Sequence, residues 1–454
     1  MADGREIVER IWARDPALWT GNDEGKWLGW LDEPWRMLED VDLLLQFADS
    51  VVDRIDAVVL LGMGGSSLAP EVIKRTFRQE TFHVLDTTHP AAIRALEQQL
   101  DLTRTLFISA SKSGSTLETR SHTDYFWEKT GGNGDQFVAI TDPGSALEQV
   151  AREREFAGVF PGEPTIGGRY SALSPFGMVP AALMGIDVSR LLLRAQEMAE
   201  ACRLADGNPG LELGLSLGEN WRDGRDKVCI ESTPGGFGLW AEQLLAESTG
   251  KLGKGLVPAP GESPDGPDRQ AQEVRLTGEY ELGQEFFRWE FATAVAGAIL
   301  EINPFDQPDV QAAKDKTWQI LSSGQDPLVD PVGSPGELYE QAQPGDYVAI
   351  CAFVNPTPDA EAKLAELAEQ ARQATGCVVT HGFGPRYLHS TGQLHKGGPP
   401  TGLFLQVVDD TGDELPIPHQ PFGFGKLIRA QAAGDFASLQ ERGRRIARIR
   451  LEDV

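Results

Sequence analysis

Hydroxyl side chains gather around one glycine in the stretch SASKSGSTLET, residues 109–119, where an apolar run ends and a helical segment begins. Ser111, Ser113 and Thr116 belong to this stretch. The N-terminus of a helix offers backbone N–H groups and the positive end of the helix dipole, and both favour phosphate. Gly114 would let the backbone approach such a ligand. A single hydroxyl would be enough to cap a helix, so the run favours an anion site.

A second glycine turn, GMGGSS at residues 62–67, follows another apolar run and contains Gly65 and Ser66. Loops at the carboxyl ends of neighbouring parallel strands meet at one crevice. We therefore expect the two loops to form one site for a single phosphate. The turn is not a G-x-G-x-x-G motif and lacks the Walker lysine spacing, so nucleotide binding is the weaker alternative.

A carboxylate with a nearby amide stands in FGLWAEQLLAESTGK, residues 237–251. The pattern predicts a helix that stops at the glycine near its end. Gln243 and Glu247 are four residues apart, so they project from one face of that helix. A positioned glutamate can act as a general base. The periodicity alone favours a solvent-exposed glutamate, so its role stays open at this point.

The elements that must position these residues alternate between strands and helices. Apolar runs such as AVVLLG, TFHVLD, RTLFIS and QFVAIT are separated by helical segments, and the pattern resumes with DKVCIESTP, DYVAICAFV and GCVVTHGF. Alternation of this kind is typical of βαβ units and parallel sheets. We therefore predict an α/β protein with two domains, each a mainly parallel sheet flanked by helices.

The predicted organisation has four parts. A helical segment over residues 1–55, rich in tryptophans that we expect to serve packing, precedes a first sheet domain over 56–200 that carries the phosphate cradle. A second sheet domain follows over 201–410, and a helical tail ends the chain over 411–454. We predict that the arginine-rich stretch LQERGRRIARIRL in this tail is a helix with a solvent-exposed face or a subunit contact.

Charge and composition restrict the partners. The chain has 454 residues and a formal net charge of -27, which repels nucleic acids and anionic membranes. It lacks an apolar run of ~18 residues, and its charged start, MADGREIVERIW, is unlike a signal peptide. We expect a cytoplasmic protein. The four cysteines form no C-x-x-C pair and no cluster with metal-ligand spacing, so we expect buried thiols and no metal.

Five motifs occur in order over residues 62–314: GMGGSSLAP, SKSGSTLET, GGRYSALSPFG, EQLLAESTGK and NPFDQPDVQAAK. Together they resemble phosphoglucose isomerase, a family built from two sugar-isomerase (SIS) domains. The ending, with LHSTGQLHKGG and PFGFGKLIRAQAAGDF, is similar to the isomerase half of bifunctional transaldolase–isomerase proteins, without their transaldolase half. The resemblance implies reversible isomerisation of glucose 6-phosphate and fructose 6-phosphate through an enediolate, without a cofactor, in a homodimer.

The resemblance also implies roles for single residues. Glu247 would be the base that moves a proton between C1 and C2, and Arg169 would lie beside these carbons. Lys314 would serve the ring oxygen during ring opening. Pro308 suits the first position of a helix, which would put Gln307 and Lys314 on roughly one face. The residues that would bind substrate or phosphate are Gly65, Ser66, Ser111, Lys112 (at least through its backbone amide), Ser113, Thr116, Gly168, Gln243 and Gln307.

A histidine for ring opening is missing from its usual place. Members of the family carry it between the glutamate motif and NPFDQP, but this chain has no histidine between His122 and His381. HKGGPPTGLFLQVV reproduces the family's Gly-Gly-Pro turn followed by a strand, so we predict that His395 opens the ring from a stiff, exposed turn of its own or a neighbouring subunit. His389 is the second choice. An ordinary histidine pKa of ~6.5 suits the task.

Other functions remain open at this stage. The same enzyme could also accept mannose 6-phosphate. A regulator built on SIS domains would keep the hydroxyl cradle but lose Glu247, Arg169 and Lys314, and would usually add a basic DNA-binding motif, which the negative charge disfavours. An aminosugar-forming isomerase would come with a glutamine-hydrolysing domain, for which no segment is evident.

Overall fold

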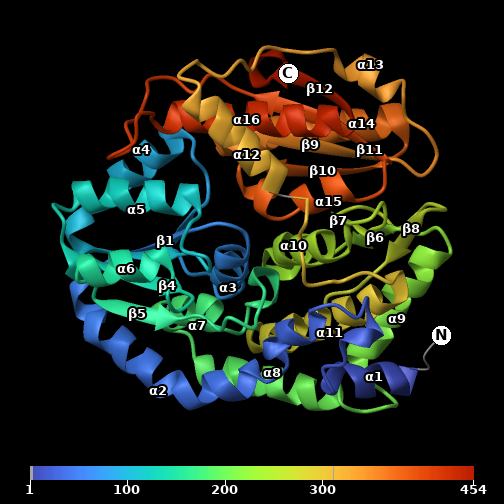
Figure 1. The fold of residues 1–454 in the computed structure, drawn as a ribbon, viewed down its shortest axis with the longest axis horizontal. Coiled ribbons are helices and arrows are strands. Elements are labelled where there is room, and N and C mark those ends of the chain that lie inside the picture. The colour runs from blue at the N-terminus through green and yellow to red at the C-terminus, as the bar shows by residue number, and fades with distance from the viewer. Residues whose placement is uncertain (1–3, 310) are drawn as a thin grey trace.

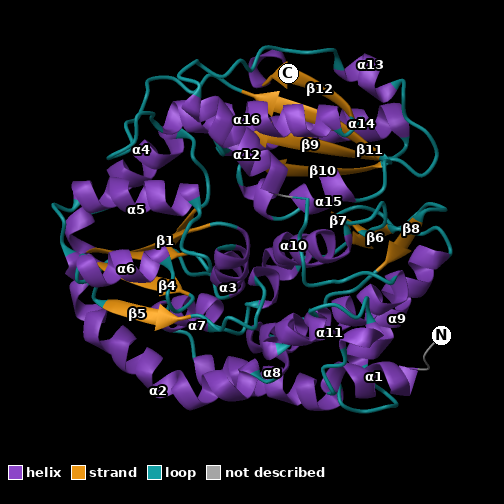
Figure 2. Ribbon diagram, viewed as in Figure 1, coloured by secondary structure: helices purple, strands orange, loops and turns teal. Residues whose placement is uncertain are grey.

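A computed structural model describes residues 4–309 and 311–454. Residues 1–3 of the predicted N-terminal segment and Val310 of the NPFDQPDVQAAK motif lie outside the described residues. Figure 1 shows three sheets arranged around helix α10 (Phe237–Thr249), with long helices along the lower side of the molecule. In Figure 2, helices lie between the sheet that contains β1 and the other two sheets.

The first sheet has five strands in the order β2-β1-β3-β4-β5, and its paired strands are parallel. β1 and β3 are buried at every position, as expected for parallel strands covered on both faces. The strands are β1 (Ala57–Gly62), β2 (Phe82–Leu85), β3 (Thr105–Ala110), β4 (Phe137–Thr141) and β5 (Gly158–Pro161). The helices of this part are α3 (Leu68–Thr76), α4 (Pro90–Gln99), α5 (Leu117–Lys129), α6 (Ala146–Glu153) and α7 (Pro175–Leu183).

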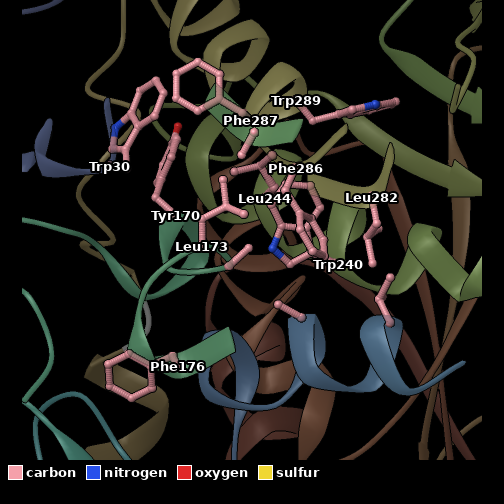
Figure 3. Packing of buried hydrophobic residues seen from close by; sticks show 14 of the residues in the cluster. Trp30, Tyr170, Leu173, Phe176, Trp240, Leu244, Leu282, Phe286, Phe287 and Trp289 are labelled. Carbon is pink, nitrogen blue, oxygen red and sulfur yellow. The ribbon is translucent and has the colours of Figure 1, made fainter. Parts of the chain in front are cut away.

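A helical layer lies along the lower side of Figure 1. It consists of α1 (Gly4–Trp12), α2 (Glu33–Val51), α8 (Val188–Ala201), α9 (Pro209–Arg222) and α11 (Leu282–Leu300). Figure 3 shows its aromatic core, where the rings of Trp30 and Tyr170 stack 5.4 Å apart and Phe287 lies beside Trp30. Trp30 is buried in this core, in line with the packing role predicted for the N-terminal tryptophans.

The rest of the chain contains two further parallel sheets, of three and four strands, where one was predicted. Their orders are β7-β6-β8 and β10-β9-β11-β12, and β7 lies beside β10. The strands are β6 (Lys227–Ile230), β7 (Val257–Pro260), β8 (Arg269–Ala271), β9 (Tyr347–Phe353), β10 (Val378–Phe383), β11 (Gly402–Val408) and β12 (Arg445–Arg450). The helices are α10, α12 (Gln311–Ser322), α13 (Pro335–Tyr339), α14 (Pro358–Thr375), α15 (Gly392–Gly397) and α16 (Phe424–Glu441). The predicted α/β class with parallel sheets and flanking helices is confirmed.

The predicted helix over the arginine-rich end is wrong. α16 ends at Glu441, and β12 pairs with β11 at the edge of the four-stranded sheet. Residues 447–450, ARIR, alternate between apolar side chains and arginine, which suits a strand. Ala447 and Ile449 belong to the hydrophobic core of this sheet, while Arg448 donates to Gln406 Oε1 over 2.6 Å. Over the described residues, no helix is long and apolar enough to cross a membrane.

Candidate active site

The two glycine- and hydroxyl-rich loops lie side by side at the carboxyl edge of the first sheet. Gly62 at the end of β1 is in register with Ala110 at the end of β3. Ser111 Oγ and Thr116 Oγ1 are 3.0 Å apart, and Ser113 Oγ lies 2.9 Å from Ser115 Oγ. These hydroxyls therefore gather at the N-terminus of α5, as the sequence predicted.

The Lys112 side chain turns away from these hydroxyls. Its Nζ donates to Asp142 Oδ2 over 2.6 Å and to the Glu163 carbonyl over 2.9 Å. The ammonium charge is thus neutralised by Asp142. A contribution of Lys112 to anion binding through its backbone amide stays a prediction.

Two adjacent glycines let three distant segments touch. Gly64 has a φ of 54°, and a Cβ there would lie 2.5 Å from the His389 carbonyl oxygen. At Gly65 a Cβ would lie 2.1 Å from the Gly168 carbonyl oxygen. Both contacts involve backbone atoms, so a side chain would force the segments apart. Ser66 is buried in the same turn.

Glu247 is 7% exposed because α10 lies at the centre of the molecule. Gln243 Nε2 donates to Glu247 Oε2 over 3.0 Å and to the His389 carbonyl over 2.9 Å. The prediction that Gln243 and Glu247 share one face is confirmed. The solvent-exposed alternative is wrong, since other elements cover the helix on all sides.

Arg169 is 2% exposed and held from several directions. Its Nε donates to Ser248 Oγ over 2.8 Å, and its Nη2 donates to the carbonyls of Pro304 and Asp306. Nη1 remains directed at the site, 3.3 Å from Gln307 Oε1 and 3.7 Å from Glu247 Oε2. A fixed cation beside a carboxylate can stabilise negative charge that develops on a bound ligand.

Lys251, which sequence reasoning missed, holds the loop that carries Gln307. Its Nζ donates to the Asn303 and Asp306 carbonyls and to Asp306 Oδ1, over 2.6 to 2.7 Å. Burial and the charge of Arg169 lower the pKa of Lys251 to about 8, although Asp306 opposes the shift. Its place at the end of the EQLLAESTGK motif was the available signal.

The helix predicted to start at Pro308 begins later. α12 starts at Gln311, and Gln307 lies in the preceding loop, so the predicted common face of Gln307 and Lys314 does not form. Hydrogen bonds from Arg169 and Lys251 to backbone carbonyls hold this loop in a non-helical conformation. Lys314 is exposed on the first turn of α12.

His389, the second choice of the sequence analysis, pairs with Glu118. His389 Nε2 lies 2.9 Å from Glu118 Oε1, which also accepts from Gln431 Nε2 over 2.7 Å. Burial alone would raise the pKa of Glu118, but His389 and Lys314 outweigh it and lower the pKa to about 2. Glu118 is therefore a carboxylate. Sequence reasoning missed it, although it lies two residues after Thr116 in the hydroxyl-rich motif.

A cavity of about 300 Å³ lies beside the His389–Glu118 pair, and Glu247 and Arg169 are not among its lining residues. His389, Glu118 and Lys314 line it together with Ser113 and Thr116. The cavity thus brings the hydroxyl-rich loop, the imidazole–carboxylate pair and an exposed ammonium into one space. No three His, Cys, Asp or Glu side chains of the described residues form a metal-binding group.

His395 lies outside that cavity, which corrects the predicted position. The expected exposed turn is wrong, because Gly392–Gly397 form the buried helix α15. His395 is 4% exposed, with its ring 5.0 Å from that of Phe404 and 5.9 Å from that of Tyr387. Burial lowers its pKa to about 3, so the imidazole is neutral. This environment does not suit the predicted ring-opening role.

Comparison with known proteins identifies relatives. Residues 46–218 match the phosphoglucose isomerase family model. The glucose-6-phosphate isomerase of Gloeothece citriformis is 34% identical over 268 residues, which cover 55% of this chain and 50% of that protein. That of Thermus thermophilus is 35% identical over 214 residues, covering 45% of this chain and 50% of that protein. The chain therefore spans about half the length of the curated relatives it matches.

Solved structures show the same fold. A glucose-6-phosphate isomerase from Chlamydia trachomatis has a TM-score of 0.52 at 19% identity, over 70% of this chain and 78% of that chain. A hypothetical protein from Thermus thermophilus has a TM-score of 0.50 at 21% identity, over 98% of this chain and 83% of that chain. The chain is therefore similar to phosphoglucose isomerases over residues 46–218, and it shares the fold of these two solved structures.

Proposed function

We propose that this chain interconverts glucose 6-phosphate and fructose 6-phosphate. The observation that carries the proposal is the buried Glu247 carboxylate, held by Gln243 and faced by Arg169 Nη1 at 3.7 Å. A base and a fixed cation in one buried place are what proton transfer through an anionic intermediate requires. The names of the relatives support the choice of substrates.

In the proposed reaction, the hydroxyls of Ser66, Ser111, Ser113 and Thr116 bind the phosphate. Glu247 takes the proton from C2 of the open-chain aldose, and the electrons form the C1–C2 double bond of an enediolate. Arg169 stabilises the negative charge on the enediolate oxygens, and Gln307 contacts the same part of the sugar. The O2 proton passes to O1, and Glu247 returns its proton to C1, which gives the ketose.

For ring opening we propose His389 in place of His395. Its pairing with the Glu118 carboxylate orients the imidazole, and an imidazole can exchange a proton with the ring oxygen. Lys314 lines the same cavity and would neutralise charge on that oxygen. His389 comes from the same chain as Glu247, so ring opening in this proposal does not need a partner subunit. The homodimer stays a prediction.

The test is a coupled assay of glucose 6-phosphate formation from fructose 6-phosphate, with a chelator present. We expect Glu247→Gln to lower kcat by about 10²–10⁴-fold, the usual contribution of a positioned base. Glu242→Gln is the matched control, because burial raises the pKa of Glu242 on the same helix to about 8 and its carboxyl is already neutral at pH 7. An inactive wild type would contradict the function, and an active Glu247→Gln would contradict the base.

The same assay separates the two histidines. We expect His389→Ala to lower kcat by about 10²-fold or more, and to lose far less activity on a sugar phosphate that is too short to close a ring. His395→Phe should keep kcat near the wild-type value, because the ring lies between Tyr387 and Phe404 outside the cavity. The reverse pattern would return ring opening to His395. Mannose 6-phosphate, left open by the sequence, can be supplied as a second substrate.

A further inference from the structure

Gln393 joins three segments of the proposed site. It is 0% exposed in α15. Its Nε2 donates to the Gly250 carbonyl over 2.9 Å and to Asp309 Oδ2 over 2.8 Å. Its Oε1 accepts from the backbone N–H of Asp309 over 2.9 Å. The Gln393 amide thus donates two hydrogen bonds and accepts one, and its partners lie in two other parts of the chain.

Each partner stands close to a residue of the proposed mechanism. Gly250 caps α10 three residues after Glu247, and Asp309 follows Gln307 by two residues. Gln393 itself follows His389 by four residues. We propose that Gln393 is a positioning residue that fixes the base, Gln307 and the ring-opening histidine relative to one another. This inference rests on the proposed function for its catalytic consequence.

The surroundings leave the amide little freedom. Arg442 Nη1 donates to the other carboxylate oxygen of Asp309 over 2.8 Å and to the Lys396 carbonyl over 3.1 Å. At Gly397 a Cβ would lie 2.2 Å from Asp309 Oδ2 and 2.7 Å from Gln393 Nε2. The segments therefore meet at van der Waals contact, and a change at Gln393 is transmitted to their backbones.

Only an amide meets the chemistry of this position. A glutamate carboxylate would face the Asp309 carboxylate and the Gly250 carbonyl without a donor. Methionine has similar length but would leave the Asp309 N–H and both acceptors without their partner, and buried polar groups in that state are costly. Replacement should therefore loosen the three segments while α15 remains packed through the buried Leu394 side chain.

The experiment compares Gln393→Met with Gln406→Met in the full chain. Gln406 is an equally buried glutamine on β11 whose amide donates to the Ala432 carbonyl and accepts from Arg448, away from the proposed site. We expect Gln393→Met to lower kcat by about 10–100-fold, the effect of a misplacement near 1 Å, while KM changes by less than about threefold. Gln406→Met should lose similar thermal stability and keep its kcat. Equal kcat values for the two variants would overturn the proposal.

A second measurement does not depend on activity. Hydrogen exchange of the backbone amides of residues 248–256 and 304–309 should accelerate at least about tenfold in Gln393→Met and stay unchanged in Gln406→Met. Unchanged hydrogen exchange in both variants would overturn the positioning role of Gln393, even if the wild type is an active isomerase. Accelerated exchange in Gln393→Met, together with a wild type that lacks isomerase activity, would support the positioning role of Gln393 and reject the proposed function.

Discussion

The ionisable side chains of the site each depend on a partner from a distant part of the sequence. The pairs are Glu118 with His389, Arg169 with Glu247, and Lys251 with Asp306. In a buried site an unpaired charge is expensive, so these pairs set both the charges and the positions of the groups. The reactivity proposed for Glu247 and His389 therefore depends on contacts that no local sequence pattern contains.

The structure contains two buried histidines, each of which should lower the free energy of unfolding in mild acid. Burial lowers the pKa of His395 to about 3 and that of His122 to about 4, whereas an unfolded histidine titrates near ~6.5. Between these values the unfolded chain binds the proton and the folded chain does not, so stability falls as the pH falls. Each histidine should cost about 2 kcal/mol between pH 7.5 and 5.

Urea unfolding at the two pH values measures this effect. His395→Phe should remove roughly half of the loss that the two histidines cause, because a phenyl ring cannot take a proton. His419, which is exposed, provides the control, and His419→Asn should leave the pH dependence as it is. A His395→Phe protein that loses as much stability in acid as the wild type would show that His395 is not buried in its neutral form.

At the scale of secondary-structure elements, the sequence predicted those features that depend on residues close together in the chain. Gln243 and Glu247 lie one helical turn apart, so their shared face followed from helix geometry. The parallel strands followed from apolar runs, and the hydroxyl cluster from its place between a strand and a helix. Each of these inferences needs only neighbours along the chain.

The remaining features depend on contacts that the fold creates. His389 reaches the site because Gly64 has no side chain and the His389 carbonyl can approach it. The sequence favoured His395 because of its glycine–proline context, but α15 turns that imidazole into the core. The sequence pattern predicted a helix over RIARIR, but these residues form β12, an edge strand that pairs with β11. In each case the packing of separate elements of the fold decides the outcome.

The close approach at Gly65 predicts that one methyl group disrupts the site. In Gly65→Ala the new Cβ would meet the Gly168 carbonyl, and both are backbone atoms that cannot turn aside. The turn after β1 and the segment with Arg169 must then separate. We expect kcat to fall at least about tenfold, measured in the coupled assay. Gly336→Ala in α13, where the described residues leave open space around the new Cβ, should have no such effect.

At the scale of the whole molecule, polar contacts join the first sheet to the last quarter of the chain. Arg386 donates two hydrogen bonds to Asp86. Gln431 forms hydrogen bonds with Thr88 and Glu118. The His89 ring forms a hydrogen bond with Asp409. The cavity lies between these parts, since Ser113 and Thr116 come from one and His389 and Gln431 from the other. Stability of the fold and geometry of the site are therefore linked.

The core also contains a carboxyl group whose ionisation opposes folding. Glu290 on α11 is 0% exposed, and neither of its carboxylate oxygens has a hydrogen-bond partner among the described residues. Burial raises its pKa well above the ordinary value, and the nearby Glu33 raises it further. The folded chain therefore keeps a proton that the unfolded chain has released above about pH 4.5. The contribution of Glu290 to stability should therefore fall as the pH rises through this range, which is opposite in sign to the contribution of the two histidines.

Glu290→Gln removes the ionisation while keeping the size of the side chain. Relative to the wild type, the variant should gain unfolding free energy as the pH rises from 5.5 to 7.5, because its amide does not ionise in the unfolded chain. Urea unfolding at the two pH values measures the gain, and Glu128→Gln at an exposed position of α5 should show none. Parallel pH dependence of Glu290→Gln and the wild type would mean that Glu290 is ionised in the folded protein. Its charge would then need a partner or water in the core.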